Sequence, residues 1–399
     1  MLGSAAAFVK GPETPIIAVV VEPLSRDRAG VGRFLRVPYT IYRDDARWVA
    51  PLCGEQRTIL SPQNPFFEHA EAQLFVVSRA GRDVGRIAAL VDHRHNELRG
   101  ERSASFGFFE CENDSAAARE LFAAVERWAT RRGLAILRGP LNPSMNDECG
   151  LLVDGFDSPP VFMATYNPRY YMTLFEAQGL RKTKDLWAYY LEPSETHVTR
   201  LTPLARRVLQ RMPDLVVRPV RKRDFQREVA AMKEIYNASW EQNWGFVPLT
   251  DAEFTFKAVR LAPLIVEELT LIAERSGCPI GFMLSLPDYN EALKPLRGRL
   301  WPFGWLRFRL GVGKIRTGRT VLLGVKKEYR GQGIESTMLL PSFRWALERG
   351  FTGLEQSWVV EDNRPVQRDL ELLGARVYKR YRLYEKSVRA EAGLVVPKT

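Results

Sequence analysis

The stretch from Val321 to Leu340 has the residue types of a ligand site. It starts with an apolar run that is typical of a buried strand, continues through a basic turn, and reaches Gly331 and Gly333, where a helix is expected to begin. Glycines at a strand-to-helix turn let the backbone approach a ligand closely, and the free N–H groups of a helix start attract an anion. The pattern therefore predicts a phosphate cradle.

Metal chemistry is not predicted. The four cysteines lie far apart and form no Cys-x-x-Cys pair, so neither a disulfide framework nor a zinc site is indicated. His93 and His95 form a His-x-His pair, but no acidic or cysteine cluster with ligand spacing accompanies them. We therefore expect these histidines to lie in solvent-exposed loops and no metal to be bound.

Composition indicates a globular protein with an anionic partner. Hydrophobic residues make up 45% of the 399 residues, enough for two domains with their own cores. The net charge of +11 and the pI near 9.5 favour a phosphorylated cofactor, an acidic lipid surface or nucleic acid as partner. The apolar run at 16–21 is too short for a membrane span, so we expect a cytoplasmic protein. A peripheral position on the inner face of the membrane is compatible with this expectation.

The predicted elements occur twice in the same order. For example, the hairpin expected at 74–91 has a counterpart at 271–286. A repeat of roughly 190 residues is too long for a solenoid, so it indicates two copies of one domain. We expect an N-terminal domain at residues 1–192, a linker at 193–214 and a C-terminal domain at 215–399.

Four motifs of the second half are shared with a known family. They are Leu323-Gly324-Val325, Arg330-Gly331-Gln332-Gly333-Ile334, Glu361-Asp362-Asn363 and Leu373-Gly374. With these motifs, the chain resembles the GCN5-related N-acetyltransferase (GNAT) superfamily. The resemblance implies an α/β (α+β) fold of two tandem GNAT-like domains, each with a mixed, splayed β-sheet flanked by helices, and it implies acyl-CoA as the donor substrate.

The same resemblance implies where acyl-CoA is held. The pyrophosphate is expected on the turn at 330–334, and the pantetheine arm along the backbone of the preceding strand at 323–325. Asn363 falls where the family often contacts the cofactor. The expected cofactor-binding residues are Leu323, Gly324, Val325, Arg330, Gly331, Gln332, Gly333, Ile334 and Asn363.

The corresponding turn of the first half does not suit a phosphate. It runs from Glu110 to Asp114, is acidic and lacks glycine, so it should repel a pyrophosphate, and we expect one cofactor site.

Two residues of the second half depart from the family pattern. Glu335 stands where the family usually has Gly or Ala, and its carboxylate would repel a pyrophosphate if it pointed inward. Leu370 stands where a tyrosine often acts as general acid, although a thiolate leaving group needs little protonation.

Further phrases extend the resemblance to the whole chain. Residues 64–70, 139–144 and 149–160 resemble a bacterial two-domain branch of these transferases. That branch includes acyl-CoA-dependent ceramide synthases, which N-acylate a long-chain sphingoid base. The resemblance therefore implies a lipid amine as the preferred acceptor, with a small amine or a peptide as the open alternatives.

The expected reaction needs a proton acceptor near the amine. Acyl transfer from a thioester requires a neutral amine, so a carboxylate or a relayed water must take up its proton. In the loop at 142–160, Asn146, Asp147 and Glu148 are candidates for orienting or deprotonating the amine, and Glu361 is a second candidate base. We expect Glu148 and Glu361 to be catalytic. The alternative interpretation is that these residues only cap turns and a helix start.

An insertion at 291–319 carries a different signal. From Lys294 to Arg319 there are eight Lys or Arg residues, no acid, and several Trp and Phe residues. Arginines interleaved with aromatic rings suit an anionic membrane surface. The same composition is compatible with RNA, or with a loop whose aromatics pack on their own domain.

These observations predict an acyl-CoA-dependent N-acyltransferase. The C-terminal copy would bind the donor, and the degenerate N-terminal copy would help to form the acceptor site. One alternative keeps the fold and uses an aminoacyl-tRNA as donor, although nucleic acid is the less favoured partner. The other is a non-catalytic module that senses acyl-CoA or lipid, which Glu335 and Leu370 would allow.

Overall fold

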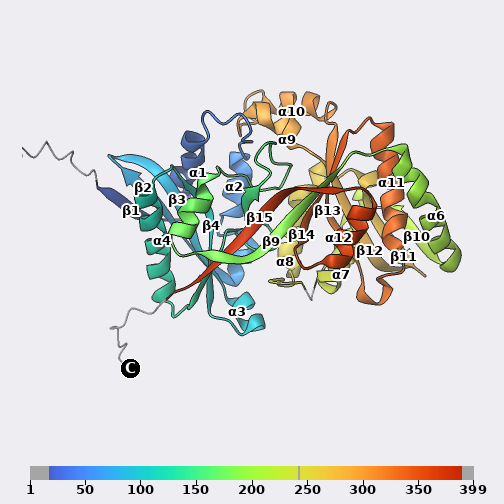
Figure 1. Cartoon of the computed structure of the whole chain (residues 1–399), viewed down its shortest axis with the longest axis horizontal. Helices are drawn as coiled ribbons and strands as arrows, with labels where there is room; N and C mark the ends of the chain where they lie inside the picture. The colour runs from blue at the N-terminus through green and yellow to red at the C-terminus, as the bar shows by residue number, and fades with distance from the viewer. Residues whose placement is uncertain (1–17, 241–242, 389–399) are drawn as a thin grey trace, which may run out of the picture.

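One long mixed β-sheet runs through the protein, which we describe from a computed structural model for residues 18–240 and 243–388 (Figure 1). From one edge to the other, its strands are β1 (Val19–Leu24), β2 (Ala70–Arg79), β3 (Arg82–Asp92), β4 (Ser103–Cys111), β5 (Ile136–Gly139), β15 (Arg376–Ser387), β9 (Arg181–Leu191), β14 (Gly353–Val360), β13 (Thr317–Val325), β12 (Cys278–Pro287), β11 (Thr270–Arg275) and β10 (Leu215–Pro219). β8 (Leu151–Asp154) pairs with β15 beside this path, and β6 (Leu141–Asn142) and β7 (Glu148–Cys149) form a separate two-stranded sheet.

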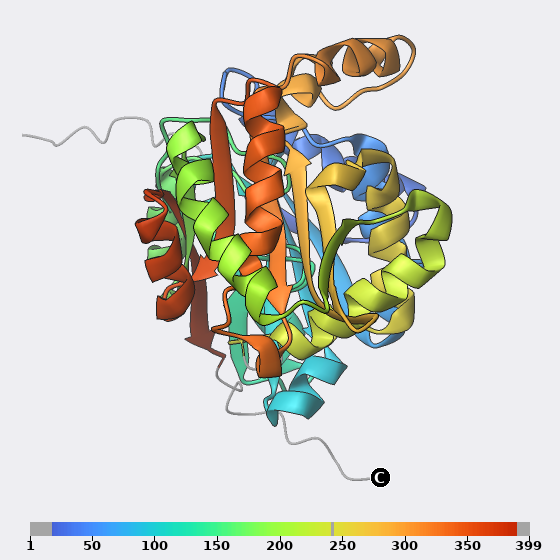
Figure 2. The same ribbon diagram turned by 90° about the vertical axis from the view of Figure 1, so that its right-hand side faces the viewer.

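Helices cover both faces of the sheet. Those of the first half are α1 (Arg28–Ile41), α2 (Cys53–Ile59), η1 (Pro65–Glu68), α3 (His93–Arg99), α4 (Ser115–Thr130) and α5 (Tyr170–Ala177). Those of the second half are α6 (Glu195–Arg211), η2 (Lys222–Asp224), α7 (Phe225–Trp240), α8 (Asp251–Leu261), η3 (Ala262–Leu264), η4 (Glu267–Leu269), α9 (Asn290–Leu293), η5 (Lys294–Leu296), α10 (Gly304–Val312), η6 (Lys327–Tyr329), α11 (Ile334–Glu348) and α12 (Arg364–Leu372). Figure 2 shows α6 and α11 side by side on one face, and α10 projecting from one end of the molecule.

The two faces have separate apolar cores. In the first half, α4 buries Phe122 against Phe106 and Phe109 on one face, while α1 buries Phe34 against Phe108 on the other. Neighbouring residues of β4 point to opposite faces, so one strand serves both cores. The second half repeats this arrangement, with α7 and α8 on one face and α6 and α11 on the other.

The last strand of each half lies beside strands of the other half. β9, which ends the first half, pairs with β14 of the second half, and β15, which ends the chain's described part, pairs with β5 of the first half. β9 and β15 also pair with each other, and they cross the middle of the molecule in Figure 1. The two halves on either side of the predicted linker at residues 193–214 therefore share one sheet. The exact domain boundaries remain a prediction.

The sheet is splayed in both halves, as expected for this fold. β13 and β14 run parallel but pair only between residues 317–320 and 353–356, after which they separate. β4 and β5 likewise pair only between residues 103–105 and 136–138. Beyond these short ladders each strand pair leaves a wedge in the sheet.

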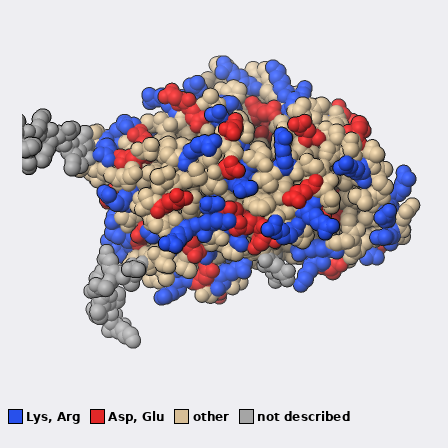
Figure 3. All heavy atoms as spheres, in the orientation of Figure 1, with Lys and Arg blue, Asp and Glu red and all other residues tan. Residues whose placement is uncertain are grey.

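The expected charge excess is spread over the surface. On the face seen in Figure 3, Lys and Arg are interspersed with Asp and Glu over all elements rather than gathered in one groove. Among the described residues, no helix is both long enough and apolar enough to cross a membrane.

Candidate functional site

The predicted phosphate cradle is a glycine turn at the start of α11. Gly331 and Gly333 have φ angles of 71° and 81°, in the left-handed region that only glycine adopts without strain. Gly333 caps α11 and has no side chain to occupy the N–H groups of the first turn. The N–H groups of Gly331, Gln332 and Gly333, which precede α11, donate no hydrogen bond to a backbone carbonyl within residues 18–240 and 243–388. The turn therefore presents several free donors to an anion.

The Arg330 side chain fixes this turn rather than reaching into solvent. Its Nε donates a hydrogen bond to the carbonyl of Val325, 3.2 Å away, and its guanidinium also donates to the carbonyl of Ser239 at the end of α7. The cation is thus held between the end of β13 and α7, directly before the two glycines. Its charge adds to the positive potential of the helix N-terminus.

The strand that leads into the cradle has one free edge. Leu323, Gly324 and Val325 pair with β12 on one side, while on the other side β14 has already separated from β13. Gly324 is required here, because a Cβ at this position would lie 2.5 Å from the Trp240 ring. Asn363 lies beyond the carboxyl end of β14, on the opposite wall of the wedge, at the start of α12. Apart from the Val325 carbonyl, which accepts from Arg330, the backbone groups on this free edge can therefore hydrogen-bond to an extended ligand.

The equivalent wedge of the first half is filled by the protein itself. The N–H of Phe108 donates to Oδ1 of Asn142 at 2.6 Å, and the N–H of Cys111 donates to the hydroxyl of Tyr171 at 2.8 Å. A Cβ on Gly107 would lie 1.7 Å from the carbonyl oxygen of Leu141, so β6 runs directly against the strand. The free edge that β13 presents is absent from β4.

The acidic turn of the first half also uses its own helix N-terminus. Asp114 caps α4 by accepting hydrogen bonds from the N–H groups of Ala116 and Ala117. Glu110 points inward and accepts hydrogen bonds from the hydroxyls of Tyr42 and Tyr171, at 2.7 and 2.8 Å. Among the described residues, only the second half has both an open wedge and an uncapped helix start.

Glu335, the departure from the family pattern, lies half-buried in the first turn of α11. Burial raises the pKa of its carboxyl, while its own backbone N–H and the charge of Arg330 oppose that rise. A raised pKa favours the neutral form, which reduces the repulsion of a nearby phosphate. Leu370 is partly buried and packs, like Leu373, against the apolar cluster that contains Val359, so this side chain has a packing role.

The two predicted catalytic carboxylates differ in their surroundings. Both oxygens of Glu361 accept hydrogen bonds, one from Nζ of Lys182 at 2.6 Å and one from the N–H of Asp185 at 3.1 Å. Glu361 therefore clamps the end of β14 to β9. Glu148 on β7 has no side-chain hydrogen bond to any described residue, and burial raises the pKa of its carboxyl against the opposing charge of Arg319.

Asn146 and Asp147, the neighbours of Glu148, tie the loop at 142–160 to the second half. Oδ1 of Asn146 accepts from the hydroxyl of Tyr236 at 2.7 Å, and Nδ2 donates to the carbonyl of Val247 at 2.9 Å. Asp147 forms an ion pair with Lys257 of α8. These contacts hold Glu148 in a fixed place between the halves.

A buried ion pair lies where β13 and β14 begin to separate. Arg319 and Glu355 are neighbours across the parallel ladder, with 3.2 Å between Nε and the carboxylate, and both are almost fully buried. Arg319 also donates to the carbonyl of Phe162 at 2.7 Å and lies 5.0 Å from the Trp358 ring. Burial raises the pKa of Glu355, and Arg319 opposes that rise. The pair joins the wedge to the loop at 142–162.

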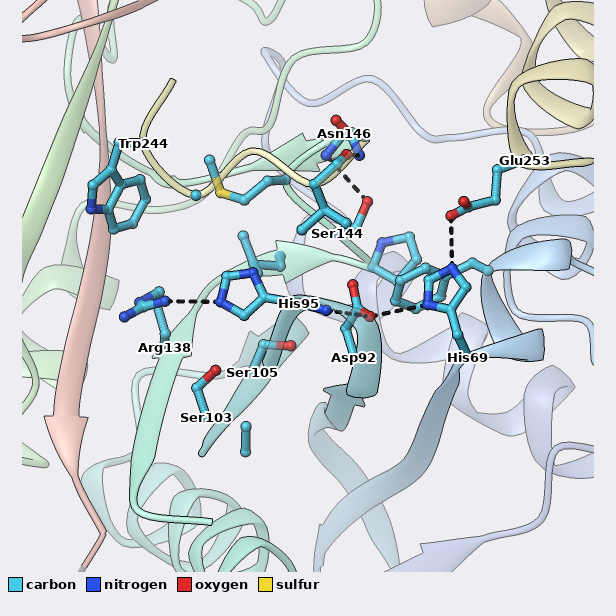
Figure 4. A pocket seen from close by; sticks show the side chains of 17 residues that line it. His69, Asp92, His95, Ser103, Ser105, Arg138, Ser144, Asn146, Trp244 and Glu253 are labelled. Carbon is cyan, nitrogen blue, oxygen red and sulfur yellow. Dashed lines mark hydrogen bonds and ion pairs between the residues drawn. The ribbon is translucent and has the colours of Figure 1, made fainter. Parts of the chain in front are cut away.

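A hollow lies between the two halves (Figure 4). Residues from both halves line it, including His69, Asp92, His95, Ser103, Ser105, Arg138, Ser144, Asn146, Trp244 and Glu253. In Figure 4 the His69 ring lies between the carboxylates of Asp92 and Glu253, at 3.0 and 3.3 Å. The hydrogen bond between Nδ1 and Asp92, and then the ion pair of Nε2 with Glu253, raise the pKa of His69 to about 9, so the ring is charged at neutral pH.

The expectation that His93 and His95 lie in exposed loops was wrong. Both lie on α3, and only His93 is exposed, whereas His95 is mostly buried in the hollow, 3.4 Å from a guanidinium nitrogen of Arg138. Burial lowers the pKa of His95, so its neutral form is favoured. The signal missed in the sequence was that this pair directly follows the buried strand β3.

The described residues contain no group of three or more His, Cys, Asp or Glu that is arranged to hold a metal ion. The functional candidates are the open wedge with its glycine turn and the hollow between the halves.

Comparisons with known proteins identify the family of the chain. Residues 229–375 match the model of the Acetyltransferase (GNAT) family. The chain is 38% identical over 370 residues to the bacterial ceramide synthase of Caulobacter vibrioides, covering 90% of this chain and 95% of that protein. It is 36% identical over 361 residues to Protein YghO of Escherichia coli, covering 89% and 92%.

A solved structure supports the fold. A tandem GNAT protein from the clavulanic acid biosynthesis pathway superposes with a TM-score of 0.56 at 14% identity, covering 93% of this chain and 99% of that one. The chain belongs to the GNAT acetyltransferase family, with a tandem GNAT architecture. It is an N-acyltransferase.

Proposed function

We propose that the protein transfers an acyl group from acyl-CoA to an amine, and that only its second half binds the donor. One observation carries the proposal: the wedge between β13 and β14 is open beside an uncapped glycine turn, whereas Asn142, Tyr171 and Asp114 fill the equivalent places in the first half. The turn at 330–334 would bind the pyrophosphate, and the backbone at 323–325 would pair with the pantetheine arm. Asn363 would contact the cofactor from the opposite wall.

The chemistry requires little from the protein beyond position and a proton acceptor. The amine nitrogen forms a bond to the thioester carbon, the C–S bond breaks with its electron pair on sulfur, and the amine proton passes to a base. We assign that base to Glu148, directly or through one water, because its carboxylate is unpaired within the described structure and its pKa is raised. Glu361 is assigned a positioning role, since Lys182 and Asp185 already occupy both of its oxygens.

A second, apolar hollow suits an acyl chain longer than acetyl. It is a small, mostly apolar hollow between the sheet and α11. Thr320 and Gln356, the last paired residues of β13 and β14, line it together with Leu339, Phe343 and Leu354. A chain attached at the closed end of the wedge would therefore enter apolar surroundings.

We further propose a lipid amine, such as a long-chain sphingoid base, as the acceptor. The support is the 38% identity to the bacterial ceramide synthase over 95% of that protein's length. The hollow between the halves, whose wall includes Ser103, Ser105 and Asn146, has hydroxyl and amide groups for the polar end of such an amine.

Mass spectrometry of products tests this proposal. The purified protein is incubated with acyl-CoA of several chain lengths and a panel of amines that includes long-chain bases and water-soluble amines. We expect an N-acylated long-chain base and stoichiometric free CoA. Products with small amines alone would contradict the lipid acceptor but keep the acyltransferase. Activity that requires aminoacyl-tRNA and disappears on RNase treatment would show that aminoacyl-tRNA, and not acyl-CoA, is the donor. Binding of acyl-CoA without any product would support a sensing module.

A further inference from the structure

Apolar side chains are exposed together at the end of the molecule where α10 projects (Figure 2). Trp301 is 83% exposed, Phe303 71% and Leu310 66%, and their neighbours Leu300, Trp305 and Leu306 are also exposed. We call these six residues the α10 patch. Elsewhere in the described chain, large exposed apolar residues are scattered along the sequence, such as Leu98, Val259 and Leu372. Contiguous exposed apolar surface of this kind marks an interaction site in a soluble protein.

The patch stands on an ordered base. Leu293 and Leu296 are buried in the core of the second half, and Phe308, on the inner side of α10, packs against Tyr289 with ring centroids 6.0 Å apart. The carbonyl of Gly298 accepts a hydrogen bond from the N–H of Cys53 in the first half. Both halves therefore hold the segment. The inner face of α10 packs Phe308 against the core, so the exposed side chains lie on its outer face.

Cations surround the patch without ionic partners. The side chains of five residues have no hydrogen bond or ion pair to any residue of the described structure: Arg297, Arg299, Arg307, Arg309 and Lys314. No acid occurs between Lys294 and Arg319. In Figure 3, Lys and Arg spheres lie along the upper edge, over α9 and α10. An exposed apolar centre with an acid-free basic border is complementary to a surface with an apolar interior and anionic headgroups.

We propose that the α10 patch docks the protein on an anionic lipid membrane. The tryptophan and phenylalanine rings enter the headgroup region, Leu306 and Leu310 reach toward the acyl chains, and the arginines contact lipid phosphates. An aromatic and basic surface also fits single-stranded RNA, but RNA binding does not require exposed Leu300, Leu306 and Leu310. The aliphatic side chains favour the lipid.

The docking leaves the donor site free. β13 begins at Thr317, shortly after α10 ends at Val312, and ends at Val325 beside the glycine turn, so the turn lies at the opposite end of a nine-residue strand. A protein held by α10 therefore presents its pyrophosphate turn to the water phase, where acyl-CoA is dissolved. The proposal does not depend on the acceptor being a lipid, and its failure would leave the acyltransferase assignment intact.

Co-sedimentation of the full chain with vesicles tests the docking. The vesicles contain phosphatidylcholine alone or phosphatidylcholine with phosphatidylglycerol. The test variant is Trp301→Ser, Phe303→Ser and Leu310→Ser combined, and the matched control combines Leu98→Ser, Val259→Ser and Leu372→Ser, three exposed residues elsewhere. We expect wild type and control to bind the anionic vesicles, and the test variant to bind them at least about tenfold more weakly.

A second variant tests the charges. Arg299→Gln, Arg307→Gln and Arg309→Gln combined should remove the preference for phosphatidylglycerol, and added salt should weaken wild-type binding. Acyl transfer to a water-soluble amine, or CoA binding, serves as the folding check for every variant. The proposal is overturned if the test variant binds as tightly as the control. It is also overturned if wild type ignores the anionic lipid, or if unstructured RNA binds through the same residues and vesicles do not.

Discussion

Glu148 is the residue on which the proposed chemistry depends. Its position could be suggested from the sequence only as one of several acids in a polar loop. The structure separates it from its neighbours, because Asn146 and Asp147 are engaged by the second half while Glu148 has no hydrogen bond to a described side chain. That difference arises from contacts with α7 and α8, which lie about a hundred residues later in the chain and leave no local signal.

We predict that Glu148→Gln lowers kcat by about 10² to 10⁴-fold without a comparable change in acyl-CoA affinity. A base works when deprotonated, and burial raises the pKa of Glu148, so wild-type kcat/KM should rise with pH through a value above the ordinary glutamate pKa of about 4.3. This rise of kcat/KM with pH should disappear in Glu148→Gln. Steady-state kinetics over a pH series provide the measurement. Glu361→Gln is the control; an equal loss of kcat with the same change of pH profile would contradict the assignment.

At the scale of elements, the glycine turn was predictable because its signals are local. Strand, basic turn, Gly331, Gly333 and helix follow one another within twenty residues. The filled wedge of the first half was predicted as non-binding from its acidic turn, but the structure gives an additional reason. Asn142 and Tyr171, distant in sequence, occupy the strand edge, and nothing in a local pattern shows that.

The contact between η1, β3 and α8 gives a prediction on pH. Asp92 and Glu253 raise the pKa of His69 to about 9, above its unfolded value of about 6.5, so the protonated ring stabilises the fold. That contribution, about 1 to 3 kcal/mol, is fully present below pH 6.5 and is lost as the pH rises through 9. His69→Gln should therefore lower the free energy of unfolding near neutral pH, with the difference shrinking by pH 10. Urea unfolding at several pH values measures this, and a difference independent of pH would contradict it.

The hollow under α11 gives a prediction on chain length. Ala346 lines it and is almost fully buried, so Ala346→Leu should fill part of the space and shift activity toward shorter acyl-CoA. Ala129 is the buried counterpart on α4 of the first half, and Ala129→Leu should cost similar stability without changing chain preference. Relative kcat/KM over a series of acyl-CoA lengths compares the two. If both variants keep the chain-length preference of wild type, the hollow does not hold the acyl chain.

At the scale of the whole molecule, the repeat predicted two related halves but not the exchange of their last strands. Hydrophobic alternation identifies a strand without identifying its partner, so the sequence around β9 and β15 could not show which half each would join. The sheet order decides it, because β15 pairs with β5 and β9 pairs with β14.

This exchange predicts that the halves do not fold alone. Residues 1–214 expressed without 215–399 lack β15, which would leave β5 as an exposed edge, and the second half without β9 loses the partner of β14. We expect each piece alone to be insoluble or unfolded by circular dichroism, and co-expressed pieces to associate. Two separately soluble pieces with native secondary structure would show that the exchange is dispensable.

The central claim is that one wedge, and not two, holds acyl-CoA. Isothermal titration calorimetry of the full chain with acyl-CoA tests it most directly, alongside Gly333→Ala and the control Gly350→Ala. Both glycines have positive φ at opposite ends of α11, so both substitutions introduce similar backbone strain, but only Gly333 belongs to the cradle. The account predicts one molecule bound per chain, weakened by about tenfold or more in Gly333→Ala and unchanged in Gly350→Ala. Two molecules per chain, or affinity that does not respond to Gly333→Ala, would contradict it.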